Sequence, residues 1–195
     1  NRKRERLVNR IKPFMLRRLK TAVAKELPPK TTIEVNIDMN DEQSKLYEAV
    51  RATMQDSIKQ IIAQQGFKRS QIQILDALLK LRQVCCHPSL LNLDSLPKGK
   101  SAVKSKAMHS AKLDYLIETV TDMVAEGRKV LIFSQFTSML ALIEQRLHSE
   151  NIGFSKLTGK TKKRSEAIEA FQSGQVPVFL ISLKAGGVGL NLTAA

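Results

Sequence analysis

The 195-residue sequence contains no tryptophan, and its two cysteines, Cys85 and Cys86, are neighbours. Adjacent cysteines form a disulfide only by straining the peptide between them, so we expect no disulfide framework. With His87 they offer three potential ligands but lack the second pair that a zinc site requires. We therefore predict no structural zinc and no other bound metal.

Long apolar runs are also missing. No uninterrupted apolar stretch approaches the length of a membrane-spanning helix, so we predict no membrane span. The sequence opens without a charged-then-apolar leader, which favours an intracellular protein. The three histidines, His87, His109 and His148, lie in different segments and accompany no nucleophile motif such as G-x-S-x-G. We expect each of them to be structural or solvated.

Acidic residues are scarce relative to basic ones. The chain has 32 Lys and Arg against 18 Asp and Glu, a formal net charge of +14. Basic side chains gather in residues 1–30, in residues 98–112, and in a cluster of Lys156, Lys160, Lys162, Lys163 and Arg164. Such a chain attracts polyanions, of which DNA and RNA are the usual ones. The charge therefore indicates a nucleic-acid partner.

The first thirty-odd residues predict a basic helix and then a strand. Residues 1–30 read as a helix interrupted near Pro13 and ended by Pro28-Pro29. Over 33–37, apolar residues alternate with polar ones. That period is typical of a half-buried strand.

Two amphipathic helices are expected next. Asn40 and Gln43 resemble a capping box that opens the first. The second covers about 71–86 and is stopped by Pro88. The predicted apolar stripes are Leu46, Val50, Met54, Ile58 and Ile61 in the first helix, and Ile72, Leu75, Leu78, Leu79 and Val84 in the second. Residues 94–110 have no periodicity and indicate a basic linker.

From Ser110 onward the pattern changes. An amphipathic helix closed by Gly127 is followed by short apolar strands at 130–133, 154–157 and 178–181, with helices between them. Strands that are buried on both faces and alternate with helices form a parallel sheet of βαβ units. The predicted fold class is therefore α/β.

Polar or glycine-rich residues follow every one of these strands. They are Ser134-Gln135, Thr158-Gly159-Lys160, and the run from Ser182 to Gly189. In open α/β sheets, ligands bind at the carboxyl ends of the strands. This edge is the candidate binding site.

A complete phosphate-binding loop is missing. Gly159-Lys160-Thr161 could end a G-x-x-x-x-G-K-[ST] motif, but the required first glycine falls on Phe154. The intervening residues predict a strand, whereas a phosphate cradle needs a free loop. The strands at 130–133 and 178–181 are followed by serine, where a Mg²⁺-binding strand would present Asp. We expect no ATP hydrolysis from this chain alone and no catalytic residue within it.

Four stretches, in order, resemble the Swi/Snf family of ATP-dependent DNA translocases within helicase superfamily two. They are PFMLRRLKTAVAKELPPK (13–30), LRQVCCHPSLL (81–91), GRKVLIFSQFTSML (127–140, the family's motif IV) and FLISLKAGGVGLNLTAA (179–195, its motif V). Cys86 stands where the family more often has Asn. The resemblance implies the second, C-terminal lobe: a RecA-like parallel sheet flanked by helices, truncated at its C-terminal side, with a family-specific helical insertion on its N-terminal side.

The resemblance also implies a division of the chain and a set of partners. Residues 1–30 would link the lobes, 31–93 would hold a strand plus the insertion, 94–110 a basic linker, and 111–195 the incomplete lobe. The implied partners are double-stranded DNA of any sequence and the first lobe. ATP and Mg²⁺ would be bound mainly by that first lobe, which carries the P-loop and acidic box, and an arginine motif would follow Ala195.

Individual roles are implied in the same way. The DNA backbone would contact Ser134, Gln135, Thr158, Gly159, Lys160, Lys162, Ser182, Lys184, Ala185 and Gly186. The nucleotide cleft between the lobes would be lined by Gly187, Val188 and Gly189, and Arg17 and Arg18 would couple the lobes.

Two other hypotheses stay open beside the translocase. In one, residues 1–30 and 98–112 belong to a non-catalytic module that binds nucleic acid or protein, and the α/β core is a scaffold. In the other, residues 153–161 serve an independent nucleotide-binding enzyme. The leading hypothesis is a DNA-associated remodeller or translocase, in the bacterial cytoplasm or nucleoid or in the eukaryotic nucleus.

Overall fold

A computed structural model describes residues 2–16, 18, 30–92, 109–187, 190 and 192–195. These residues form two compact units, divided between Asn36 and Ile37. The predictions made for Arg17, Val188, Gly189 and most of the linker at 94–110 lie outside the described residues. Within the described residues, no helix is both long and apolar enough to cross a membrane.

The first unit begins with the predicted basic helix. Helix α1 spans Arg2–Ile11 and is followed by a short 3₁₀ helix, η1, at Lys12–Phe14. The interruption near Pro13 is confirmed, because a proline in the helix interior removes a backbone donor and clashes with the preceding turn.

The predicted strand at 33–37 is wrong. Residues 30–40 contain no strand, and the Ile33 and Val35 side chains are 79% and 50% exposed. Alternation shows only that a segment suits a half-buried strand, and a strand also needs a neighbour to share its backbone hydrogen bonds. In the described part of the chain, the sheet has three strands, and this segment is not one of them.

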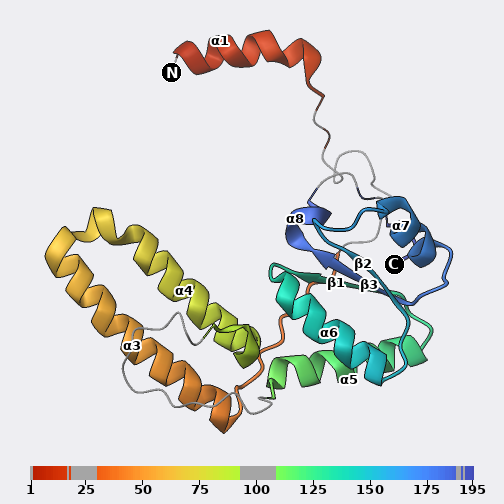
Figure 1. The fold of residues 1–195 in the computed structure, drawn as a ribbon. Coiled ribbons are helices and arrows are strands. Elements are labelled where there is room, and N and C mark those ends of the chain that lie inside the picture. The colour runs from red at the N-terminus through yellow and green to blue at the C-terminus, as the bar shows by residue number, and fades with distance from the viewer. Residues whose placement is uncertain (1, 17, 19–29, 93–108, 188–189, 191) are drawn as a thin grey trace. The chain divides into compact units, whose positions relative to one another are not determined.

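The second unit opens with a helical hairpin. Helix α3 (Asp41–Gln65) and helix α4 (Gln71–Cys86) are joined through the 3₁₀ helix η2 (Phe67–Ser70), and η3 (Pro88–Leu90) follows α4 (Figure 1). Asn40 caps α3 and accepts a hydrogen bond from the backbone N–H of Gln43 at 2.8 Å. The capping box is only half formed. The Gln43 side chain instead donates a 2.7 Å hydrogen bond to the carbonyl oxygen of Val84, and this bond links α3 to α4.

The apolar stripe was predicted correctly for α3 but not for α4. Leu46, Val50 and Met54 of α3 are buried. In α4, the predicted Val84 is buried, as is Ala77, which was not predicted. The other four predicted residues, Ile72, Leu75, Leu78 and Leu79, are 77%, 65%, 51% and 41% exposed. Helix α4 is apolar on more than one face, so its sequence period cannot identify the face that meets α3.

The α/β part confirms the predicted parallel sheet. Its elements are α5 (Ala111–Ala125), β1 (Val130–Ser134), α6 (Thr137–Ser149), β2 (Phe154–Leu157), α7 (Arg164–Gln172), β3 (Val178–Ser182) and α8 (Leu183–Gly186). The strand order is β1-β3-β2, and both pairings are parallel. The helix predicted between the strands at 154–157 and 178–181 begins at Arg164.

The central strand β3 is buried along its whole length. Val178 and Leu180 pack with residues of α5 and α6, while Phe179 and Ile181 pack with Phe171 of α7. Successive side chains of a strand point to opposite faces, so β3 supplies both halves of the core. The result is a three-layer arrangement with helices on both faces of the sheet (Figure 1).

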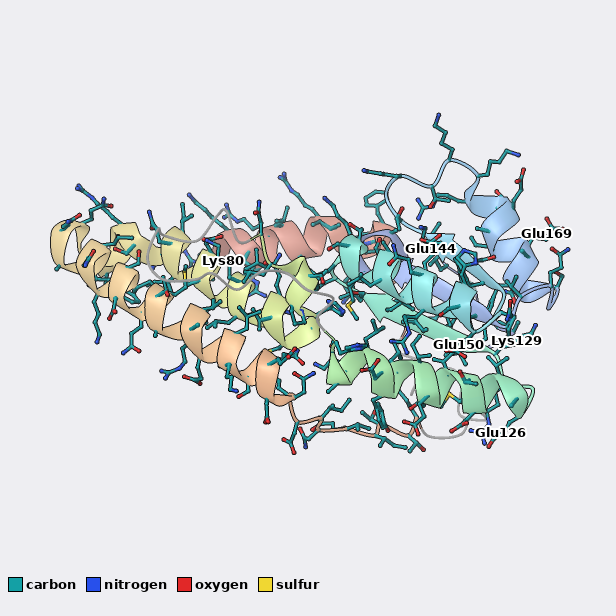
Figure 2. The ribbon with its side chains drawn as sticks, turned by 60° about the horizontal axis from the view of Figure 1, so that its bottom comes forward. Lys80, Glu126, Lys129, Glu144, Glu150 and Glu169 are labelled. Carbon is teal, nitrogen blue, oxygen red and sulfur yellow. The ribbon has the colours of Figure 1, made fainter. Side chains whose placement is uncertain are left out.

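Side chains cap the helices that border the sheet. Ser110 caps α5 by accepting from the Leu113 N–H, and its hydroxyl donates 2.8 Å to the carbonyl oxygen of Cys86 at the end of α4. Lys129 lies at the C-terminal end of α7 (Figure 2) and donates hydrogen bonds of 3.2 Å to the carbonyl oxygens of Phe171 and Gln172. A cation at this position satisfies the last carbonyls and complements the helix dipole.

The Cys-Cys-His run lies at the end of α4. Burial raises the pKa of the Cys85 thiol, which keeps it protonated at neutral pH. Burial also lowers the pKa of His87, whose neutral Nδ1 accepts a hydrogen bond of 3.1 Å from the Ser89 N–H. Within the described residues, no group of three His, Cys, Asp or Glu could hold a metal ion.

Candidate nucleic-acid interface at the carboxyl edge of the sheet

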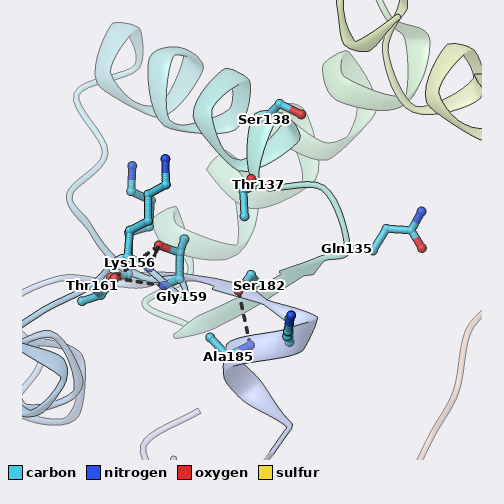
Figure 3. Close-up of a pocket in the computed structure, with 11 residues that line it drawn as sticks. Gln135, Thr137, Ser138, Lys156, Gly159, Thr161, Ser182 and Ala185 are labelled. Carbon is cyan, nitrogen blue, oxygen red and sulfur yellow. Dashed lines mark hydrogen bonds between the residues drawn. The ribbon is translucent and has the colours of Figure 1, made fainter.

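The carboxyl ends of the three strands meet at one pocket. Ser134 of β1 is level with Ser182 of β3, and Leu157 of β2 is level with Ile181, so the following loops leave the sheet side by side. The pocket has a volume of about 880 Å³. Its lining residues are Gln135, Thr137, Ser138, Lys156, Thr158, Gly159, Lys160, Thr161, Ser182, Lys184 and Ala185 (Figure 3). We refer to it as the strand-end pocket.

The loop after β2 is a tight turn held by threonine hydroxyls. The Thr158 N–H donates 2.9 Å to Thr161 Oγ1, and the Thr161 N–H donates 3.1 Å to the Thr158 carbonyl oxygen. Thr158 Oγ1 accepts from the Lys160 N–H at 3.3 Å. A side-chain Cβ at Gly159 would meet nothing within 4 Å, so the glycine faces open space. The turn thus presents Gly159 and Lys160 toward any ligand of the pocket.

The loop after β3 turns directly into the short helix α8. Ser182 is its N-cap and accepts from the Ala185 N–H at 3.4 Å (Figure 3). Arg164, at the start of α7, donates 2.9 Å to the Ala185 carbonyl oxygen. A Cβ at Gly186 would lie 2.8 Å from Ile181 Cγ2 and 3.2 Å from Phe133 Cε1. Glycine is therefore required here because α8 approaches the sheet closely.

The loop after β1 carries Gln135 to the rim of the pocket. The Ser134 hydroxyl accepts from the Phe136 N–H at 3.1 Å and so helps to hold this turn. The first helical residues after it, Thr137 and Ser138, line the pocket. The N-terminus of α6 therefore lies at the site, where unpaired amides and the helix dipole favour an anion.

The charge of the pocket is positive. Its lining includes Lys156, Lys160 and Lys184 but no Asp or Glu. Lys156 forms an ion pair with Glu144 of α6, which offsets part of its charge. No salt bridge among the described residues involves Lys160 or Lys184. These two lysines are the cations best suited to meet an external anion.

The structure brings seven of the ten predicted DNA-contacting residues into one pocket. They are Gln135, Thr158, Gly159, Lys160, Ser182, Lys184 and Ala185. Ser134, Lys162 and Gly186 do not line it. Of the other predicted site residues that are described, Gly187 and Arg18 are exposed and lie outside the pocket lining.

Four lining residues were not predicted from the sequence: Thr137, Ser138, Lys156 and Thr161. Thr137 and Ser138 could have been found, because a helix that starts just after a parallel strand places its N-terminus at the carboxyl edge. Lys156 belongs to the basic cluster noted in the sequence, but it lies inside β2, where alternation alone does not show which residues approach the edge.

The residues of this pocket alone could not bind Mg²⁺ together with a nucleoside triphosphate. No carboxylate lines it to hold the metal. Phe154–Leu157 form strand β2, so residues 153–161 are not a free phosphate loop. The independent nucleotide-binding hypothesis therefore loses its structural basis.

Both halves of the chain match models of known protein families. Residues 1–90 match the family model "SNF2-related domain", and residues 111–195 match "Helicase conserved C-terminal domain". An uncharacterized ATP-dependent helicase of Mycoplasma pneumoniae is 36% identical over 97% of this chain and 17% of its own length. The human SWI/SNF-related matrix-associated actin-dependent regulator of chromatin subfamily A member 1 is 33% identical over 98% of the chain and 18% of its own length.

A solved structure gives the same result for the fold. The SWI2/SNF2 ATPase core of Sulfolobus solfataricus, in complex with dsDNA, superposes with a TM-score of 0.68 at 32% identity. The match covers 100% of this chain and 40% of that one. The chain thus spans less than a fifth of the length of the two curated relatives above and two fifths of the solved core.

Proposed function

Because the chain belongs to the SNF2-related family and ends in a helicase conserved C-terminal domain, we propose that it is the second lobe of an ATP-driven translocase on double-stranded DNA. In this role the lobe grips the phosphate backbone. The observation that carries the proposal is the strand-end pocket, where three separate loops converge with three lysines and no acidic side chain.

The groups at this pocket suit phosphates better than bases. Lys160 and Lys184 are point charges, and Gln135 and the first turn of α6 add neutral hydrogen-bond donors. Contacts to phosphate position a protein on the duplex without reading its sequence. The related Sulfolobus core was solved with dsDNA, which supports duplex DNA as the polymer. We therefore expect binding that is independent of sequence and sensitive to salt.

In this proposal, the first lobe binds most of the ATP and the Mg²⁺. The strand-end pocket lacks a carboxylate for the metal, so the first lobe would hold the metal. In this proposal, Gly187, Val188 and Gly189 would line this lobe's side of the nucleotide cleft between the lobes. The exposed Arg18, with Arg17, would couple the two lobes. The protein would act inside the cell, where its DNA lies.

The competing proposal is a non-catalytic module in which the basic segments alone bind nucleic acid or protein. ATP hydrolysis by the full-length protein, measured with and without duplex DNA, separates the two. We expect hydrolysis to rise several-fold when duplex DNA is added and to reach the same maximum with duplexes of unrelated sequence. Hydrolysis that does not respond to any duplex would support the module instead.

A further inference from the structure

An arginine of the helical hairpin contacts a residue at the rim of the strand-end pocket. Arg82 of α4 donates a hydrogen bond to Gln135 Oε1 at 2.5 Å, across 53 positions of sequence. Gln135 lies at the rim, on the opposite side of the pocket from Lys156 and Thr161 (Figure 3). None of the pocket's lining residues comes from the hairpin itself. Arg82 therefore links the insertion to the proposed DNA grip.

The last turns of α4 hold Arg82 in place. Val84 is fully buried in the hairpin core, and its carbonyl oxygen accepts from the Gln43 side chain. The carbonyl oxygen of Cys86 accepts 2.8 Å from the Ser110 hydroxyl at the start of α5. These two contacts fix the backbone that directly follows residue 82 and so limit the positions that the guanidinium can reach. Gln135, by contrast, is exposed and lies in a loop.

The contact determines which way the Gln135 amide points. A glutamine amide carries an acceptor oxygen and a donor NH₂, whereas a guanidinium only donates. The oxygen must therefore face Arg82, and the NH₂ must point away from it. Without Arg82 the amide can rotate by half a turn and present its oxygen to an incoming phosphate, which repels it.

We propose that Arg82 is a positioning residue for DNA binding: it orients the Gln135 amide so that its NH₂ donates to the phosphate backbone at the strand-end pocket. This inference rests on the proposed function and adds a role for the helical insertion. The insertion then contributes to the grip without touching the DNA at this point.

The test uses the full-length protein and measures the duplex DNA concentration that gives half-maximal ATP hydrolysis. We expect Arg82→Ala to raise this concentration about three- to tenfold, the worth of one hydrogen bond. The maximal rate should stay unchanged, because the residue acts on DNA binding only. Arg82→Lys should recover most of the affinity, since Lys also donates to the amide oxygen. Arg69→Ala, which removes an exposed cation from η2 of the same hairpin, is the matched control and should have no effect.

The partner residue separates positioning from other roles. In a Gln135→Ala background, Arg82→Ala should cause no further loss. Gln135→Glu keeps the link as an ion pair but removes the donor, and it should weaken DNA binding at least as much as Gln135→Ala.

Three outcomes overturn the inference. Losses that add in the double variant would show that Arg82 acts independently of Gln135, and an Arg82→Ala protein with wild-type affinity would show that it does not act at all. Both leave the proposed function standing, because the wild-type protein still responds to DNA. A wild-type protein whose hydrolysis and binding ignore duplex DNA would contradict the proposed function and this inference together.

Discussion

Replacing Lys160 and Lys184 with alanine is expected to weaken binding of duplex DNA by about tenfold per lysine at 0.1 M salt. Lys160 lines the strand-end pocket from the loop after β2 and Lys184 from helix α8, and neither takes part in a salt bridge among the described residues. Each phosphate contact by a lysine releases about 0.9 of a condensed counterion. Fluorescence anisotropy with the full-length protein and labelled duplexes of two unrelated sequences measures the loss, which should be the same for both.

Lys162 is the matched control for this prediction. The sequence suggested that it acts beside Lys160, but it is exposed and does not line the pocket. Lys162→Ala should therefore weaken binding much less than Lys160→Ala, although both remove one positive charge from the same loop. Equal losses would mean that net charge, and not the pocket, carries the affinity. A loss that differs between the two duplexes would argue for base reading.

Alanine at Gly186 is expected to destabilise the second unit by about 1–3 kcal/mol, the usual cost of overpacking a core. The new Cβ would lie 2.8 Å from Ile181 Cγ2, and Ile181 is fully buried in β3. Its Cγ2 is attached to the branched Cβ and cannot swing away as a flexible chain end does. Urea denaturation followed by circular dichroism measures the change in unfolding free energy.

Gly187→Ala tests whether this effect comes from crowding. A Cβ there would meet no atom closer than the Leu183 carbonyl oxygen at 3.5 Å, and the residue already has helical backbone angles. We expect its unfolding free energy to stay within about 0.5 kcal/mol of wild type. Similar destabilisation by both substitutions would contradict the close approach of α8 to the sheet.

The sheet and its ligand edge were predictable because their signals are local. Short apolar runs at 130–133, 154–157 and 178–181 became β1, β2 and β3. Once the sheet was known to be parallel, the residues after each strand had to share an edge. Seven predicted residues consequently line one pocket, even though the loops that carry them are far apart in sequence.

The features that the sequence did not predict correctly depend on contacts between residues that are far apart in the chain. The alternation at 33–37 has the right period for a strand, but no strand pairs with it in the described part of the chain. Helix α4 has apolar residues around most of its circumference, and the small Ala77 lies at the contact while Leu75 and Leu78 stay exposed. The hydrogen bond from Arg82 to Gln135 joins positions whose proximity no local pattern encodes.

The most direct test of the phosphate grip is the salt dependence of duplex affinity in the wild-type protein. We predict a linear fall of the logarithm of the association constant with the logarithm of salt concentration. Its slope should be steeper than about −1.8, the contribution of two lysine–phosphate contacts. The slope should not depend on DNA sequence. An affinity that stays flat from low to moderate salt would contradict a backbone grip at the strand-end pocket.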